Sequence, residues 1–158
     1  MALRYPDVEL DGAAREQALD RCRARLAEWQ VVVPEEFILL LNFGLDDFER
    51  WGLTEFWVAN ETQAGYCGKF LFLFDGQACP EHHHRIKHET FYILRGQVRM
   101  VADGAERLMK SGDTLVMPPG VRHTFSGAGD ALILEVSQPS LRGDNFFVDR
   151  RIGRDGVI

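Results

Sequence analysis

The chain has 158 residues, 46% of them hydrophobic, and a formal net charge of -6. This length suits one domain with a sizeable core, the apolar content excludes a disordered chain, and the acidic balance argues against a nucleic-acid or anionic membrane partner. There is no signal-peptide core, no apolar run near the roughly 20 residues of a membrane span, and no metal-type spacing of Cys22, Cys67 and Cys79, so we expect a soluble cytoplasmic protein with reduced thiols.

The first 50 residues predict helices. From residue 13 to residue 30, apolar side chains recur at spacings of three and four, with charged residues on the other faces. These apolar residues are Leu19, Cys22, Leu26 and Trp29. Asp11 is the candidate N-cap. A second helix is expected over residues 33–44, because Pro34 and two acids suit a first turn, residues 37–41 supply an apolar body, and Gly44 can end it. Residues 1–50 are therefore expected to form a helical extension packed on the rest of the chain.

Residues 51–158 are expected to form a β-barrel with a C-terminal tail. Short runs rich in β-branched and aromatic residues alternate with turn pairs such as Asp75-Gly76 and Asp103-Gly104. The expected strands cover residues 55–60, 66–74, 78–84, 90–94, 97–102, 106–110, 114–117, 123–126 and 131–137. Many short strands at this spacing favour an antiparallel sandwich or barrel. The tail, residues 142–158, has an apolar segment at residues 146–148 that predicts packing on the barrel or on a partner.

A cluster of histidines lies between Gly76 and Gly96. His82 and His84 are two residues apart, so on a strand they project from the same face, and Glu89 follows where a turn can return it to them. Two imidazoles and a carboxylate that meet at one point suit a divalent metal. The alternative is a solvated polar turn beside the basic residues 85–87. The other two histidines of the cluster are expected to be structural or exposed: His83 and His88.

A second stretch, from Gly112 to His123, contains a strand, a Pro-Pro-Gly turn and a further histidine. Together the two stretches resemble the two signature motifs of the cupin superfamily. The matching positions are Gly76, His82, His84, Glu89 and Gly96 in the first motif, and Gly112, Pro118, Gly120 and His123 in the second, with Gly127 in place of the closing Asn. The resemblance implies a mainly β fold, the cupin double-stranded β-helix or jelly-roll barrel, with N-terminal helices. It also implies the metal ligands His82, His84, Glu89 and His123.

Two charged residues interrupt otherwise apolar strands. Lys69 is the only charge in residues 66–74, and Glu135 is the only charge in residues 131–137. A buried charge is costly unless it is paired or lies in a wet cavity. Either each side chain faces solvent on the polar side of its strand, or both line the barrel cavity. In the second case Glu135 could act as a base, and Lys69 could polarise or protonate an oxygen.

Segments outside the two motifs resemble the small bacterial D-lyxose isomerase family, and the similarity covers roughly residues 33–152. They include Tyr66-Cys67-X-Lys69, Leu73-Phe74-X-Gly76-Gln77 and Asn145-Phe146-Phe147-Val148-Asp149-Arg150. The resemblance implies one divalent ion per chain, typically manganese, with Lys69 and Glu135 as acid–base groups. Iron, cobalt, nickel and zinc suit the same donors. The implied reaction is aldose–ketose isomerisation through a metal-stabilised enediolate, on D-lyxose and D-xylulose or on D-mannose and D-fructose.

Two loops are shorter than in that family: residues 85–88 and residues 97–111. Because such loops shape the mouth of the cavity, the identity of the sugar stays open. Two other functions compete. An iron dioxygenase with the same four ligands would consume oxygen and would not need Glu135, and a non-catalytic sugar-binding cupin would bind without turnover. The expected partners are an unphosphorylated sugar and a second copy of the chain in a homodimer, with no nucleic acid or membrane.

Overall fold

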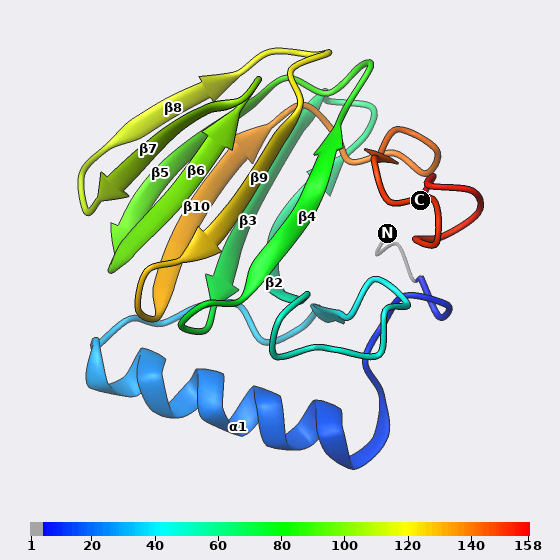
Figure 1. Ribbon diagram of the computed structural model, residues 1–158. Helices are drawn as coiled ribbons and strands as arrows, with labels where there is room; N and C mark the ends of the chain where they lie inside the picture. The colour runs from blue at the N-terminus through cyan, green and yellow to red at the C-terminus, as the bar shows by residue number, and fades with distance from the viewer. Residues whose placement is uncertain (1–4) are drawn as a thin grey trace.

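The computed structural model describes residues 5–158, which form two antiparallel β-sheets and one α-helix (Figure 1). The six-stranded sheet has the order β1 (Ile38–Leu41), β2 (Leu53–Glu61), β3 (Tyr66–Leu73), β10 (Ala131–Ser137), β5 (Glu89–Arg95) and β8 (Thr114–Met117). The five-stranded sheet has the order β11 (Phe146–Phe147), β4 (Ala78–His83), β9 (His123–Gly127), β6 (Gln97–Ala102) and β7 (Ala105–Lys110). All nine strands expected after residue 51 are present, with bounds that differ by two residues at most.

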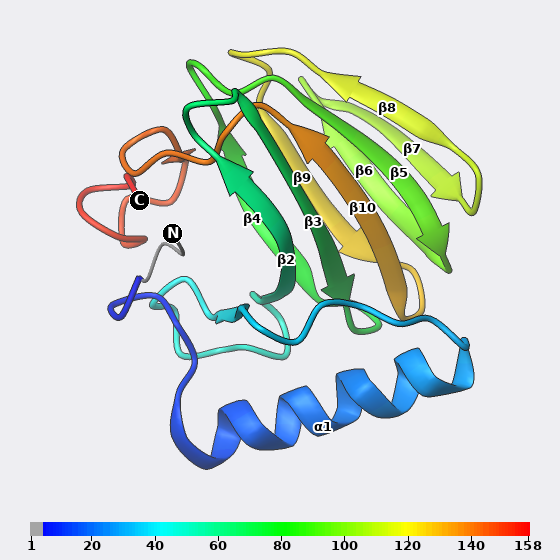
Figure 2. The same ribbon diagram turned by 180° about the vertical axis from the view of Figure 1, so that it is seen from behind.

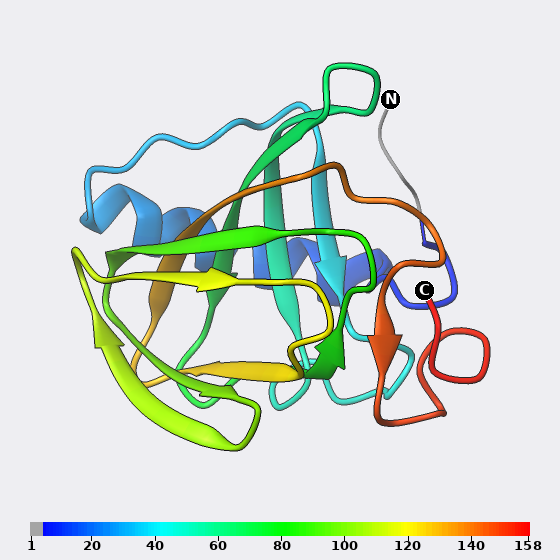
Figure 3. The same cartoon turned by 90° about the horizontal axis from the view of Figure 1, so that it is seen from above.

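The two sheets face each other and enclose the main core (Figure 3). Alternate residues of each strand point inward, as the period of two requires. Leu71, Phe91 and Ile133 come from the six-stranded sheet, and they meet Met100 and Phe125 from the five-stranded sheet. All five side chains are fully or almost fully buried. The mainly β barrel predicted from the sequence is therefore confirmed, and its interior is where a polar site would have to be built.

The helix α1 (Gly12–Glu28) lies across one end of the strands (Figures 1 and 2). Its apolar stripe, which includes Leu19 and Cys22, packs against the outer side of the six-stranded sheet at Phe56 and Phe72. The predicted helix is thus confirmed, together with its buried face. Asp11 occupies the N-cap position, but its side chain makes no capping hydrogen bond. The buried residues of the helix belong to the cluster on the outer side of the sheet, and none of residues 12–28 is part of the main core. Residues 5–158 contain no helix with the length and apolar character that a membrane crossing requires.

The second predicted helix, over residues 33–44, is wrong. Residues 38–41 form the strand β1, which pairs with β2. The run Ile-Leu-Leu-Leu is buried on both faces, with Ile38 and Leu40 against the α1 cluster and Leu39 against Trp57. A short continuous apolar run cannot be assigned to helix or strand from its periodicity, and here burial on two sides favours the strand. The six-stranded sheet therefore extends into the segment that was expected to be wholly helical.

The C-terminal tail packs against the barrel, which is one of the two arrangements predicted for it; the other was packing on a partner. Phe146 and Phe147 form β11, which pairs with β4 at His83 and His82. The backbone N–H of Val148 also donates to the carbonyl oxygen of Glu81, at 3.0 Å. Figures 1 and 2 show the tail on the side of the molecule where β4 lies, away from α1. The tail therefore lies next to the strand that carries His82 and ends directly before His84.

Candidate active site and metal centre

Three histidines converge inside the barrel. His82 lies on β4, His84 follows directly after that strand, and His123 begins β9. Because β4 and β9 are paired with His82 opposite His123, their rings lie 4.3 Å apart between centroids. One ring nitrogen of each histidine lies within 4.8 Å of the others, and all three residues are buried. The spacing of two along β4 thus places His82 and His84 on one face, as the sequence predicts.

Glu89 brings its carboxylate to the same place from the opposite sheet. It is the first residue of β5, and its Oε1 and Oε2 lie 3.3 Å from Nε2 of His84 and 3.5 Å from Nε2 of His123. The four residues implied as ligands by the cupin resemblance therefore meet where the two sheets face each other. His83 is half-buried and stacks on Phe146 outside this centre, and His88 is exposed, so both expectations for these two residues are confirmed.

The donor atoms at this centre fit a divalent metal ion. Nε2 of His84, Nε2 of His123 and Oε2 of Glu89 are buried without a hydrogen-bond partner. A buried polar atom without a partner costs about 1–3 kcal/mol, so three at one point indicate a missing common partner. The Nδ1 atoms of His82, His84 and His123 lie 2.8, 2.8 and 3.0 Å from backbone carbonyl oxygens. Each Nδ1 is therefore the protonated nitrogen, and each Nε2 presents a lone pair to the centre.

The charge state of these groups agrees with this fit. Burial, together with the neighbouring imidazoles, lowers the pKa of His82 well below its usual range, and burial also lowers the pKa of His123. Both rings are therefore neutral near pH 7, which is the form that binds a metal. Burial alone would raise the pKa of Glu89, but the nearby Lys87 ammonium and His84 outweigh it and hold the pKa well below the usual range. Glu89 is thus ionised and can supply a negatively charged donor.

Lys69 and Glu135 both face the interior. They lie directly opposite each other on β3 and β10, and Nζ of Lys69 is 3.6 Å from Oε2 of Glu135. Strand alternation puts Lys69 on the face of Leu71, and it puts Glu135 on the face of Ile133, in the main core. Both residues line the cavity that is also lined by His82, His84 and Glu89. The alternative in which these two charges face solvent is therefore wrong.

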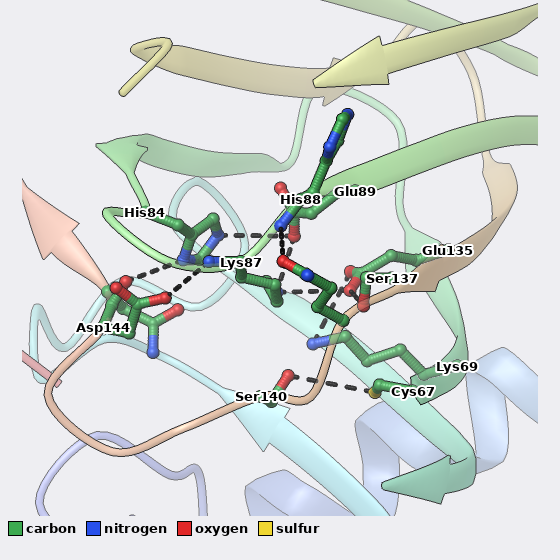
Figure 4. Close-up of polar contacts among 12 residues, drawn as sticks. Cys67, Lys69, His84, Lys87, His88, Glu89, Glu135, Ser137, Ser140 and Asp144 are labelled. Carbon is green, nitrogen blue, oxygen red and sulfur yellow. Dashed lines mark hydrogen bonds and ion pairs between the residues drawn. The ribbon is translucent and has the colours of Figure 1, made fainter. Parts of the chain in front are cut away.

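Two further charged residues of the site were not predicted. Glu55 on β2 accepts hydrogen bonds from Nζ of Lys69 and Nε1 of Trp57, both at 2.9 Å. Its sequence signal was the same as for Lys69, a single charge within an apolar strand segment. Lys87 lies in the loop before β5, and its Nζ is 2.6 Å from Glu89 and 3.2 Å from Glu135 (Figure 4). Since Lys87 lies in a mostly polar run, with Arg85, His88 and Glu89 close by in sequence, no apolar contrast marked it.

The site is a buried network of opposite charges. Burial alone would lower the pKa of Lys69, but Glu135 and Glu55 outweigh it and raise the pKa well above its ordinary value. The same balance, with Glu135 and Glu89 as the acids, raises the pKa of Lys87. Both ammonium groups therefore stay charged at neutral pH. With three carboxylates and two ammonium groups, the network has a net charge of one negative unit. A bound divalent cation would change this to one positive unit.

The cavity around this network has apolar walls and a polar end. Its apolar walls include Leu53, Leu71, Phe91, Phe125 and Phe147. The charged groups come from β2, β3, β10 and the start of β5, while the imidazoles come from β4 and β9. Tail residues, Asn145 among them, complete the lining. Apolar walls around a few convergent polar groups are typical of a site that binds a small molecule and excludes water.

Comparisons with known proteins agree with this site. Residues 72–137 match the family model of the cupin domain. A D-lyxose/D-mannose isomerase of Thermosediminibacter oceani is 31% identical over 153 residues, which cover 78% of this chain and 83% of that protein. A D-lyxose ketol-isomerase of Cohnella laeviribosi is 28% identical and covers 78% and 82%. Among solved structures, the L-ribose isomerase of Cellulomonas parahominis has the same fold, with a TM-score of 0.76, 17% identity and coverage of 95% and 98%. The chain therefore belongs to the family of cupin-fold D-lyxose/D-mannose isomerases.

Proposed function

We propose that this protein is a metal-dependent aldose–ketose isomerase that interconverts D-lyxose and D-xylulose, or D-mannose and D-fructose. The observation that carries the proposal is the burial of Lys69 and Glu135 in the cavity that is also lined by three of the four ligand-type residues, His82, His84 and Glu89. A module that only binds sugars has no need for a buried carboxylate and two buried ammonium groups, which are costly to desolvate. The names of the related proteins support the same reaction class.

His82, His84, Glu89 and His123 would hold the metal ion. When bound, a divalent ion would act as a Lewis acid on the carbonyl oxygen and the neighbouring hydroxyl oxygen of the sugar. Imidazole and carboxylate donors admit manganese as well as iron, cobalt, nickel and zinc. Manganese and the homodimer are further parts of the proposal, tested by metal analysis of the purified protein and by its mass in solution.

Glu135 would act as the base that moves the proton between carbons. In the aldose-to-ketose direction its carboxylate takes the proton from C2, and the resulting carboxylic acid returns a proton to C1. Lys69 would assist the matching proton shift at oxygen, from the hydroxyl on C2 to the oxygen on C1. The two side chains lie 3.6 Å apart on neighbouring strands, so one bound sugar can contact both. Glu55 would hold the Lys69 ammonium in place from the other side.

Lys87 would add a second positive charge beside the reacting carbons. Its ammonium group lies between Glu89 and Glu135, so it can stabilise negative charge that develops on the sugar during proton abstraction. The apolar walls exclude water and thereby strengthen each of these electrostatic interactions.

The test is proton NMR in deuterated water with manganese-loaded protein and four sugars: lyxose, xylulose, mannose and fructose. We expect deuterium at C1 or C2, with interconversion of one aldose–ketose pair. Glu135→Gln should lower both by about 10²–10⁴-fold. Glu106→Gln is the matched control, because Glu106 is an exposed acid on β7, and it should leave the rate unchanged. Absence of exchange with all four sugars, in protein that holds one metal per chain, would refute the proposal. Oxygen uptake by iron-loaded protein would then support the dioxygenase alternative.

A further inference from the structure

The tail residue Asp144 makes an unusual set of contacts with the loop that precedes β5. Its carboxylate is buried, and it accepts hydrogen bonds from three consecutive backbone N–H groups. Figure 4 shows Asp144 beside His84 and Lys87. Oδ1 accepts from Arg85 at 2.9 Å and from Ile86 at 3.1 Å, and Oδ2 accepts from Lys87 at 3.0 Å. Hydrogen bonds to an ionised carboxylate are about twice as strong as neutral ones. One side chain therefore satisfies three of the four backbone N–H groups of residues 85–88, and Gln138 accepts from the fourth, that of His88, at 3.1 Å.

The backbone of Asp144 makes a contact of a different kind. Its carbonyl oxygen accepts from Nδ1 of His84, at 2.8 Å. This contact sets the orientation of the ring whose Nε2 faces Glu89 at 3.3 Å. Asp144 thus contacts both a ligand-type histidine and the loop that follows it. Neither interaction is predictable from local sequence, because about 60 residues of chain separate the partners.

The conformation of this loop decides where Lys87 lies. Arg85, Ile86 and His88 are exposed, whereas Lys87 alone is buried, with its ammonium group between Glu89 and Glu135. A rotation of the loop that satisfied its amides with water instead would carry Lys87 out of the cavity. Within residues 5–158 the carboxylate of Asp144 has no ion pair with a cationic side chain, so its charge is stabilised by the loop amides.

We propose that Asp144 is a positioning residue for the isomerisation. Through the loop amides it holds the Lys87 ammonium beside Glu135, and through its carbonyl oxygen it orients His84. The inference rests on the proposed function, since it assigns a role toward the same reacting groups. The proposal also gives the C-terminal tail a part in the reaction. The tail contacts the loop through Asp144, and it pairs with β4 through β11.

The key variant is Asp144→Asn. The amide has nearly the shape of the carboxylate, but its NH₂ group must face at least one loop N–H, which places donor against donor. We expect kcat to fall by about 10–100-fold, the range for residues that orient metal ligands and reacting groups, with a smaller change in KM. Asp149→Asn is the matched control. Asp149 lies in the same tail and accepts from the backbone N–H of Arg151, at 3.0 Å, yet does not contact the loop. It should behave as the unmodified protein.

Two readouts separate positioning from a general effect on folding. In a double-mutant cycle, Asp144→Asn should have a smaller effect on kcat once Lys87→Met is present, because part of its effect is exerted through the Lys87 ammonium. The absorption spectrum of cobalt-loaded protein should change in Asp144→Asn and not in Asp149→Asn, since the ring of His84 moves. Asp144→Glu keeps the charge but is longer by one methylene group, so it should retain more activity than Asp144→Asn and less than the unmodified protein. If Asp144→Asn does not fold, the Glu variant and its cobalt spectrum decide the question.

The inference is overturned if folded Asp144→Asn has unchanged kcat and an unchanged cobalt spectrum, or if its effect multiplies fully with that of Lys87→Met. Should Asp144→Asn not fold, an Asp144→Glu protein with the kcat and spectrum of the unmodified protein, despite reduced stability, overturns it equally. A protein that isomerises none of the four sugars would instead refute the proposed function. The cobalt spectrum would still report whether Asp144 orients His84, so the two failures are distinguishable.

Discussion

Metal binding should stabilise this fold strongly. The gain in the free energy of unfolding depends on the free metal concentration relative to Kd. Three buried donor atoms at the centre have no hydrogen-bond partner, and a bound ion would satisfy all three. For an ion that binds only the folded state, a free concentration of 1,000 times Kd adds about 4.1 kcal/mol to the free energy of unfolding. For a chain of 158 residues, each kcal/mol raises Tm by about 2–4 °C. The metal should therefore raise Tm by about 8–16 °C.

Scanning calorimetry of chelator-treated protein, with and without manganese, measures this shift. Two neighbouring histidines of β4 supply the variant and its control. His82→Ala removes a buried imidazole of the centre and should abolish most of the shift, whereas His83→Ala removes a half-buried ring that stacks on Phe146 and should preserve it. An equal shift in the two variants would place the ion elsewhere. No shift in the unmodified protein at saturating metal would refute the reasoning that the centre lacks a cationic partner.

Three other measurements test the packing and charge of the fold. Glu55→Gln should lower the free energy of unfolding in urea by about 2 kcal/mol, because Lys69 loses its nearest charged acceptor. Burial raises the pKa of Cys22 to about 12. From the ordinary thiol pKa of 9.0, the stability that the buried neutral thiol contributes is complete below pH 9 and is lost as pH rises toward 12. At pH 10.5 the loss is about 2 kcal/mol, and Cys22→Ala should lack it. Gly96→Ala should cost more than about 2 kcal/mol in thermal unfolding, because its φ is +74° and a Cβ would lie 2.2 Å from a carbonyl oxygen. Gly104→Ala, with a similar φ and open space, should cost about 1 kcal/mol. Three results would contradict these expectations. They are an unchanged stability of Glu55→Gln in urea, a Cys22→Ala protein that loses stability at alkaline pH as the unmodified protein does, and equal costs of the two glycine substitutions.

The parts of the site that were predictable are those with a local signature. The spacing of two between His82 and His84 has a direct geometric meaning on a strand, and a charge within an apolar run marked Lys69 and Glu135. Lys87 lacked such contrast because it lies in a mostly polar loop rather than in an apolar strand. The contacts of Asp144 depend on where the tail docks, which no local pattern encodes.

The same reasoning explains the incorrect helix over residues 33–44. Proline and acids near the start of that segment suit a helix, but they suit a loop before a strand equally well. What decides the structure is that residues 38–41 fill the space between α1 on one side and the interior of the barrel on the other. Tertiary burial therefore overrode the weak local preference.

The position of β10 has a consequence for how the protein reaches its native state. This strand comes late in the chain, yet it lies in the middle of the six-stranded sheet, between β3 and β5. Until it inserts, both neighbours expose unpaired edges, and such non-local pairing folds slowly and leaves intermediates open to aggregation. Because β10 also carries Glu135, an incompletely folded chain lacks the proposed base. Completion of the sheet and the onset of activity should therefore occur in one kinetic step, with no partly folded species that isomerises sugar.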